Sequence, residues 1–475
     1  MGKVDPNSLH SDGLQAPMSR RQMLRLLSLG LGAAATSSVL AACGSAPAAP
    51  AGTAATAAPV AAGATAVPAA PAAAARPLTP TFYQWIVDLH PSLPEVNKGF
   101  PDLNFQIAPV EGFGIERFVA EGKNKESTWD VYVGMTPFVE MSQLIKADVI
   151  EPWDNYIPKD VIDDLLPSIR AECTVDGKLY SWPFLLDVVG MAWNSALTDK
   201  AGITNIPATW DEYLTNAQQV KDSGAAPYGA TFDARGWRSL VPFTHSLSTD
   251  VYTADGLFDF TNDAAVEALK LMKKIMDLAN PDILNEGTTD GGVNNTPDEG
   301  AFAAQKAAYY TKYFNSPLRF AQTGGFSDKL QMAALPKFAN GAGATVFWTT
   351  GSCLFKYGQN KDKAAEYVKA LTYNQQIWQD SIAGSATAHP GQLPPYTSIY
   401  AGWDATPPAW MQPFVGLVRS QLDVAKAITN HPFGLTQFVI GKPLWEEFLT
   451  GKEADPKAAL QKAKDAVLAE IAKAA

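Results

Sequence analysis

Apolar residues along the chain alternate between short runs of strand length and longer segments with helical spacing. Three early runs, 81–87, 105–110 and 129–134, are typical of buried strands, with helical segments between them. Strands that alternate with helices predict a parallel sheet covered by helices on both faces. The body of the protein is therefore expected to begin with an α/β unit.

Two strands are predicted within the next apolar stretch. Asp176-Gly177 is a tight-turn dipeptide, the run 179–182 is strand-like, and the run 185–193 has strand length and is apolar apart from Asp187. A lone carboxylate is costly to bury unless it is hydrogen-bonded. Asp187 therefore either faces a polar cleft or has a dedicated partner, and the alternatives to a ligand contact are a local turn cap or a neighbouring basic residue.

A second α/β unit is predicted further along the chain. Thr209 and Glu212 have the spacing of a capping box, so a helix should begin there. Strands are expected at 227–232 and 307–310, and the segment 262–279 has the apolar spacing of a helix. A last helix is expected to follow Asp455-Pro456.

The first 42 residues have the features of a signal peptide. The twin-arginine pair Arg20-Arg21 precedes an uncharged apolar run that ends in Leu-Ala-Ala-Cys at Cys43. A transmembrane helix is the weaker interpretation, because the run is short, rich in Ala, Gly and Ser, and ends in a lipoprotein-type cleavage box. We expect Cys43 to be lipidated and residues 43–78, rich in Ala and Pro, to form a linker.

Charge and chemistry narrow the function by exclusion. The chain has 37 basic and 48 acidic residues and a net charge of −11, which argues against a nucleic-acid partner. The five histidines show no metal spacing, and the chain lacks a nucleophile elbow, a zinc-protease motif, a P-loop and a dinucleotide fingerprint. We therefore expect no metal and no cofactor. Paired carboxylates for glycoside hydrolysis stay open, because acidic residues are many.

Cysteines and aromatic residues add two expectations. Cys173 and Cys353 are interpreted as two separate buried thiols, with a disulfide as the alternative. The 12 Trp, 15 Tyr and 22 Phe could supply flat platforms for the apolar faces of sugar rings. Five tryptophans lie in predicted elements and are expected in the core: Trp182, Trp193, Trp210, Trp378 and Trp445.

The stretch 175–213 carries a family resemblance. Its order of Gly-Lys-Leu-Tyr, Pro, an acid, aromatic-Asn, Gly and Pro-x-Thr-Trp-Asp-Glu resembles the extracellular solute-binding proteins of ABC importers, family 1, in the maltodextrin-binding-like branch. The segments 300–310, 335–337, 350–371 and 448–471 match the same family in order. The resemblance therefore extends over nearly 300 residues of the chain.

The resemblance implies a fold and a division into lobes. The fold is α/β, the type II architecture of periplasmic binding proteins, with two α/β lobes, crossing strands and a hinged ligand cleft. Lobe 1 is expected to comprise 79–188 plus 344–395. Lobe 2 is expected to comprise 189–343 plus 396–475.

The function implied by the resemblance is capture of a carbohydrate by cleft closure and its delivery to the permease of an ABC importer. The protein would be a monomeric lipoprotein on the outer face of the membrane, without catalysis. One alternative is a surface-tethered carbohydrate-active enzyme. Another is a receptor for a non-sugar solute such as a polyol, a glycerophosphodiester or a polyamine. Departures from the maltodextrin pattern at Met135-Thr136, Asp187 and 347–350 leave the solute class open.

Candidate ligand contacts come from two sources. Ligands of parallel sheets bind beyond the carboxyl ends of strands, which selects Asp88, His90, Glu111, Phe113, Met135 and Thr136. The resemblance to sugar binders adds Trp85, Asp187, Arg235, Gly236, Trp237, Tyr313, Phe314, Trp348, Thr349, His431 and Phe433.

Overall fold

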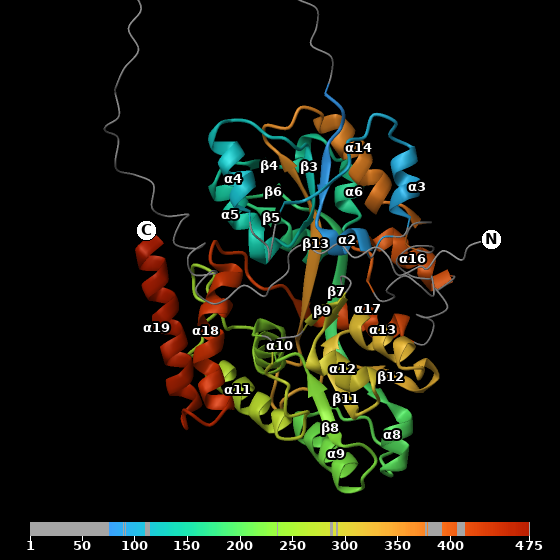
Figure 1. Cartoon of the computed structure of the whole chain (residues 1–475), viewed down its shortest axis with the longest axis vertical. Helices are drawn as coiled ribbons and strands as arrows, with labels where there is room; N and C mark the ends of the chain where they lie inside the picture. The colour runs from blue at the N-terminus through green and yellow to red at the C-terminus, as the bar shows by residue number, and fades with distance from the viewer. Residues whose placement is uncertain are drawn as a thin grey trace, which may run out of the picture. The chain divides into compact units, whose positions relative to one another are not determined.

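The computed structural model describes most of the chain after residue 75 (Figure 1). The described residues are 76–88, 90, 92–109, 115–234, 236–285, 288–290, 293–375, 378, 392–405 and 414–474. The part from Arg76 to Lys473 is one compact unit. Cys43, the signal peptide and residues 44–75 of the predicted linker lie outside the described residues, whereas its last three residues, 76–78, belong to the compact unit.

The first part of the sheet is parallel, as the alternating pattern predicts. β1 (Pro80–Phe82) lies between β2 (Gln106–Ile107) and β3 (Val131–Met135), and both neighbours run in its direction. The predicted strand 81–87 is wrong in its second half, because α2 (Gln84–Asp88) begins two residues after β1 ends. A short apolar run does not distinguish a strand from a buried helix, and the pairing of β1 with β3 stops at Phe82.

Helices and short strands surround this part of the sheet. They are α3 (Leu93–Lys98), α4 (Glu116–Lys123), the π-helical turn η1 (Pro137–Met141), α5 (Ser142–Lys146), β4 (Ile150–Glu151), the 3₁₀ turn η2 (Trp153–Asn155), α6 (Lys159–Asp163), α7 (Pro167–Glu172), β5 (Thr174–Val175), β6 (Lys178–Leu179) and α14 (Lys361–Thr372). The predicted turn is confirmed: Asp176 and Gly177 join β5 to β6 with φ of 49° and 74°, as a two-residue hairpin turn requires.

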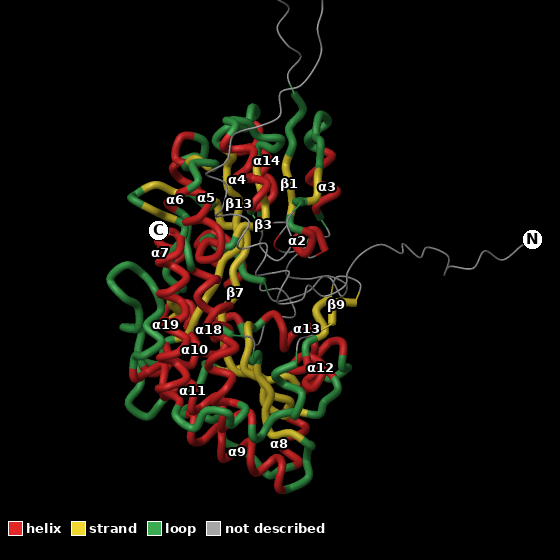
Figure 2. Tube along the Cα trace, turned by 60° about the vertical axis from the view of Figure 1, so that its left-hand side comes forward, coloured by secondary structure: helices red, strands yellow, loops and turns green. Residues whose placement is uncertain are grey.

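Two long strands connect this part to the rest of the sheet. β7 (Trp182–Asn194) and β13 (Thr345–Phe355) are antiparallel, and every residue of β7 is buried. Figures 1 and 2 show them side by side between α4 and α14 at one end and α8 and α9 at the other. The sheet order is β2-β1-β3-β13-β7-β11-β8, with β4 and β14 (Ala425–Lys426) on β13 and β12 (Leu330–Ala333) on β7.

The second part of the sheet confirms the second α/β unit. β8 (Tyr228–Phe232) and β11 (Ala307–Tyr313) are parallel, and β11 pairs with the end of β7. The capping box is confirmed at the start of α9 (Trp210–Asp222), where Thr209 and Glu212 satisfy each other's backbone N–H groups.

The remaining elements lie around this second part and along the last stretch of the chain. They are α8 (Ser195–Lys200), α10 (Trp237–Leu247), α11 (Asp263–Met276), β9 (Thr288–Asp290), β10 (Val293–Asn295), α12 (Pro297–Ala303), α13 (Asn315–Thr323), the 3₁₀ turn η3 (Ser327–Lys329), α16 (Thr397–Ala405), α17 (Val415–Val424), α18 (Gly434–Leu449) and α19 (Pro456–Ala474). The predicted helices at 262–279 and after Asp455-Pro456 are confirmed as α11 and α19.

The core agrees with the expectations for tryptophan and cysteine. The five tryptophans expected inside are all buried, and Cys173 and Cys353 are separate buried thiols rather than a disulfide. The lobe boundaries stay a prediction. The segment at Tyr396, placed in lobe 2 from the sequence, contacts the expected lobe 1, because its hydroxyl accepts from the indole N–H of Trp182 at 2.6 Å.

Candidate functional site

The candidate site is built on the stretch where β7 changes partner. Val188 of β7 pairs with Phe347 of β13, whereas the next residue, Val189, pairs with Tyr313 of β11. Asp187 lies directly opposite Trp348 in this antiparallel ladder, so both side chains point to the same face of the sheet. The polar and aromatic groups of the site are thus placed by strands that belong to both parts of the sheet.

Four aromatic rings are in mutual contact at this point. Tyr313 lies between Trp348 and Trp237, with ring centroids 5.7 Å and 6.1 Å away. Trp237 also meets Phe138 of η1 edge-to-face, at 4.9 Å. Tyr313, Trp237 and Phe138 are buried, and Trp348 is half-buried. Gly236, at the N-cap of α10 with φ of 66°, turns the chain into the helix that begins with Trp237.

Asp187 is fully buried, and its two oxygens differ. Oδ1 accepts a hydrogen bond from the backbone N–H of Val188 at 2.9 Å, and Oδ2 has no hydrogen-bond partner. Burial raises the pKa of Asp187 well above its usual range, although the N–H groups of Asn315 and Phe314 and the charge of Arg319 oppose the shift. The Val188 contact is local, and the N–H groups of Asn315 and Phe314 lie near the same carboxyl group.

Glu172, at the end of α7, is a residue that the sequence patterns did not single out. Its Oε2 accepts a 2.6 Å hydrogen bond from Thr349 Oγ1, and Asn430 donates to its backbone oxygen at 2.7 Å. Its Oε1 has no partner, and burial raises the pKa of Glu172 to about 8. Thr349, a predicted contact, is therefore buried and holds this carboxyl group.

A buried network of charges lies at the ends of β8 and β11. Lys312 Nζ is 2.8 Å from Asp298 Oδ2 and from Glu299 Oε1, and 3.3 Å from Asp233 Oδ2. Arg238 Nε lies 3.8 Å from the same Asp233 oxygen. Asp233 directly follows β8, so the rule that ligands bind beyond strand ends could have found it. The network fixes Asp233 and Arg238 next to Trp237, over whose ring the Arg238 guanidinium lies at 4.7 Å.

Four other predicted contacts are buried side chains: His90, Met135, Thr136 and Phe314. His90 stacks on Phe184 at 5.1 Å, and burial lowers its pKa to about 4. Met135 ends β3 inside the core, and Thr136 is buried at the start of η1. Phe314 fills the space beside Gly190, where an added Cβ would lie 2.1 Å from its ring.

His431 and Phe433 precede α18. His431 Nδ1 accepts the backbone N–H of Phe433 at 2.9 Å, so the histidine caps the approach to this helix. Burial lowers the pKa of His431, although the charge of Asp255 opposes the shift. Both residues are half-buried.

Five predicted contacts cannot be placed. Glu111, Phe113 and Arg235 lie outside the described residues, and for Trp85 and Asp88 the structure describes the backbone of α2 but not the side chains. They stay predictions.

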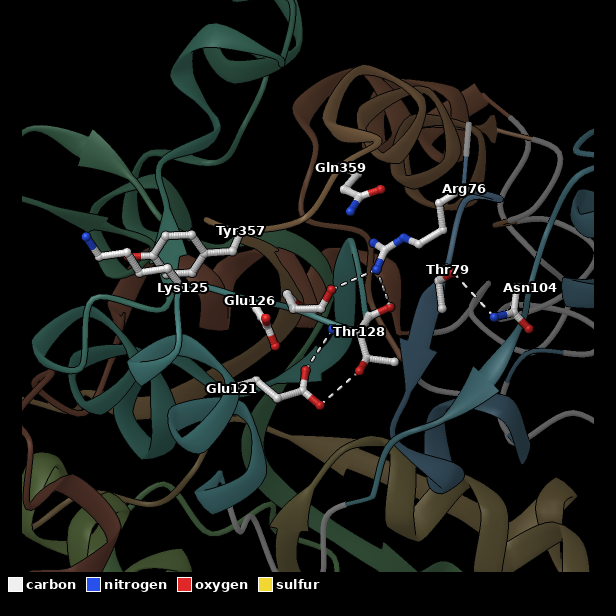
Figure 3. A pocket seen from close by; sticks show the side chains of 10 residues that line it. Arg76, Thr79, Asn104, Glu121, Lys125, Glu126, Thr128, Tyr357 and Gln359 are labelled. Carbon is white, nitrogen blue, oxygen red and sulfur yellow. Dashed lines mark hydrogen bonds between the residues drawn. The ribbon is translucent and has the colours of Figure 1, made fainter. Parts of the chain in front are cut away.

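A cavity of about 540 Å³ lies elsewhere, near the start of the described chain (Figure 3). Arg76 and Glu121 are among its lining residues, and it contains none of the predicted ligand contacts. Arg76 donates to the carbonyl oxygens of Ser127 and Thr128 at 2.7 and 2.9 Å and pairs with the buried Asp130 at 2.6 Å. These contacts fasten the beginning of the described chain to the segment that leads into β3.

The described residues contain no group of three or more His, Cys, Asp or Glu side chains that could hold a metal ion. Among their helices, none is both long and apolar enough to cross a membrane.

Comparison with known proteins gives a family match. The family model described as bacterial extracellular solute-binding protein matches residues 87–377, more than half of the chain. A binding protein of Brucella abortus is 24% identical over 317 residues, which cover 64% of this chain and 72% of its own. The erythritol/L-threitol-binding protein of Mycolicibacterium smegmatis is 24% identical over 307 residues, 60% of each chain.

Solved structures show the same fold. The GacH receptor of Streptomyces glaucescens, whose crystal structures include a complex with acarbose, superposes with a TM-score of 0.65 at 18% identity, covering 82% of this chain and 98% of its own. An ABC transporter solute-binding protein of Agrobacterium vitis with bound D-mannitol gives 0.65 at 19% identity, covering 84% and 98%. The predicted α/β fold of periplasmic binding proteins is thereby confirmed.

Proposed function

Because the chain belongs to the family of bacterial extracellular solute-binding proteins, we propose that it is the solute receptor of an ABC importer and that its solute is a carbohydrate or a polyol. Members of this family act outside the cytoplasm. They are binding proteins rather than enzymes, which argues against the alternative of a tethered carbohydrate-active enzyme. Relatives and neighbours named for erythritol and threitol, acarbose and mannitol support a polyhydroxylated solute.

For this chain's own residues, the proposal rests on the aromatic cluster next to Asp187. Trp237 of α10, Tyr313 of β11 and Trp348 of β13 form an aromatic cluster beside the carboxyl group of Asp187, which has one unpartnered oxygen. Aromatic faces bind the C–H faces of sugars and polyols, and a carboxylate accepts hydrogen bonds from their hydroxyl groups. A solute held there contacts both predicted lobes, so its binding favours the closed arrangement that a permease would recognise.

A thermal-shift screen tests this function. The panel comprises polyols, mono- and oligosaccharides, glycerophosphodiesters and polyamines. A ligand at 100 times its Kd adds about 2.7 kcal/mol to the free energy of unfolding, so binders raise the melting temperature measurably. Stabilisation by a sugar or polyol is the expected result. Stabilisation by a glycerophosphodiester or a polyamine alone would contradict the proposed solute class.

Asp187→Asn tests the site with the ligand found in this way. The substitution keeps the shape and removes the charge, so it should weaken binding by about 1.5 to 3 kcal/mol, the contribution of hydrogen bonds to charged groups. The ligand-free variant should be as stable as the wild type or slightly more so, because a buried ionisable group is lost. Calorimetry on both proteins measures the difference, and an unchanged Kd would remove Asp187 from the site.

A further inference from the structure

The buried acids of the candidate site fall into two groups. Asp233, Asp298 and Glu299 each lie within 4 Å of Lys312, which is itself buried, and the partly exposed Arg238 and Arg319 approach the same group. Glu172 and Asp187 have no ion pair with any lysine or arginine in the part of the chain that the structure describes. Neither carboxyl group is therefore neutralised by an ion pair, although the more distant charge of Arg319 acts on Asp187.

Each of these two carboxyl groups also has an oxygen that lacks a hydrogen bond. Glu172 is 5% exposed with Oε1 unpartnered, and Asp187 is 0% exposed with Oδ2 unpartnered. Most buried polar groups in proteins have partners, so such atoms at a binding site point to groups that a ligand brings. The oxygens of an ionised carboxyl group only accept hydrogen bonds, so a ligand that binds the ionised forms would have to bring donors.

The two carboxyl groups are held at neighbouring positions of β13. Trp348 lies opposite Asp187, and the next residue, Thr349, donates to Glu172. Tyr313 packs against Trp348, and its hydroxyl is buried without a hydrogen-bond partner. Burial raises the pKa of Tyr313, the charges of Asp187, Asp233 and Glu172 raise it further, and the charge of Arg238 lowers it. The electron-rich faces of this aromatic pair also attract cations.

We propose that the solute is a polyhydroxylated compound with a basic nitrogen, an amino sugar or an amino polyol, and that Glu172 receives its ammonium group beside Tyr313. This inference rests on the proposed function and specifies the solute class for the same site. Asp187 keeps its role as an acceptor of hydroxyl groups. The protonated nitrogen supplies both donors and the positive charge that the protein does not place beside Glu172.

A dependence on pH follows from the surroundings of these groups. Glu172 is faced by Cys173, Thr349 and Tyr313, and burial raises the pKa of Glu172 to about 8, so the empty site holds its proton at pH 7. Asp187 is faced by Arg319 of α13, Tyr313 of β11 and Tyr400 of α16. An ammonium ion binds the ionised form of Glu172, so its binding releases a proton and strengthens between pH 6 and pH 8. The affinity for a neutral sugar should not rise over this pH range.

Calorimetry on the full chain with matched ligands tests this inference. The pairs are N-methylglucamine against sorbitol, glucosamine against glucose, and the chitosan disaccharide against cellobiose. We expect at least one amine, titrated at a pH at which its nitrogen is protonated, to bind about tenfold or more tightly than its neutral partner. Titrations in two buffers of different ionisation heat should show a proton released on binding of the amine only.

Two variants identify the group responsible. Glu172→Gln should abolish the preference for the amine, and its proton release, so that the amine and its neutral partner bind this variant with affinities equal within about threefold. Glu140→Gln is the matched control, because burial also raises the pKa of Glu140 to about 8 but both its oxygens have partners, Tyr132 and the N–H of Thr136. That variant should keep the preference.

Three outcomes would overturn the inference. Equal or tighter binding of the neutral partners would contradict a solute with a basic nitrogen, while the proposed function would still stand. A preference for the amine that persists in Glu172→Gln would show that Glu172 does not bind the ammonium group. Failure of every compound in the pairs and of the wider sugar and polyol panel would reject the proposed function together with this inference.

Discussion

At the scale of single residues, the two tryptophans of the aromatic cluster have different surroundings. Trp237 is 6% exposed, packs against Phe138 and Tyr313, and has the Arg238 guanidinium over its ring. Trp348 is half-buried and packs against both main clusters of the core. Trp348 is therefore the better candidate for a ring that stacks on a sugar, and Trp237 serves more as its support.

Alanine at each position should separate these roles. Trp348→Ala should cost about 1 to 3 kcal/mol of ligand affinity, by analogy with truncated interface aromatics. Trp237→Ala should lower the free energy of unfolding by about 3 to 5 kcal/mol, the usual cost of removing a buried tryptophan. Denaturant unfolding and calorimetry on both variants measure the two effects. Full affinity in Trp348→Ala would mean that this ring only packs.

Glu140 makes stability depend on pH. Its pKa rises from 4.5 to about 8 on burial, so the folded protein holds a proton that the unfolded chain releases above pH 4.5. The folded state then binds more protons, and stability falls as the pH rises from about 4.5 to 8. Glu140→Gln should reduce this fall in denaturant unfolding at pH 5 and pH 8. A pH profile identical to that of the wild type would show that Glu140 ionises normally in the folded state.

At the scale of elements, η1 and α18 meet across the predicted lobes. The carbonyl oxygen of Phe138 lies so close to Gly434 that a Cβ added there would be 1.8 Å from it. The same Phe138 contacts Trp237 at the start of α10. The close approach of η1 to α18 thus requires glycine at position 434 and keeps Phe138 on the aromatic cluster.

Replacing this glycine should therefore cost stability. Gly434→Ala forces η1 or α18 to move, and we expect a loss of about 1 to 3 kcal/mol in the free energy of unfolding, typical of overpacking. Gly416→Ala in α17 is the control, since an added Cβ there has nothing within 4 Å. The control should be neutral or gain about 0.5 to 1 kcal/mol from better helix propensity. Equal stability of the two variants would contradict the close packing.

At the scale of the whole molecule, attachment to the membrane depends on the N-terminal segment. The sequence Leu-Ala-Ala-Cys predicts lipidation at Cys43, and the linker of about 34 residues that follows would span roughly 35 to 100 Å between its coil and extended limits. We propose that the body is tethered to the outer face of the membrane at that distance, as a monomer.

Cys43→Ser tests the tether. The variant should leave the membrane fraction or accumulate as an uncleaved precursor, because serine lacks the thiol that receives the lipid. Membrane fractionation and the mass of the exported protein measure this. Processing and fractionation unchanged from the wild type would contradict the lipid anchor.

The sequence alone determined the elements with strong local signals. The capping box at Thr209, the turn at Asp176-Gly177 and the apolar run of β7 involve neighbouring residues, so their physics can be seen in the chain. The order of motifs also identified the family and, through it, the fold. The lobe boundaries and the ligand contacts were predicted but stay to be tested.

Only the tertiary structure decided which side chains of the site lie together. Asp187 was visible as a charge in an apolar run, but its place opposite Trp348 depends on a strand more than 150 residues away. Glu172 gave no sequence signal, because its burial and its bond to Thr349 arise from packing between distant segments. His90 and Phe314 follow the strand-end and family patterns, yet the structure packs them on Phe184 and Gly190. Local patterns determine elements, whereas burial and pairing across the sheet depend on the whole fold.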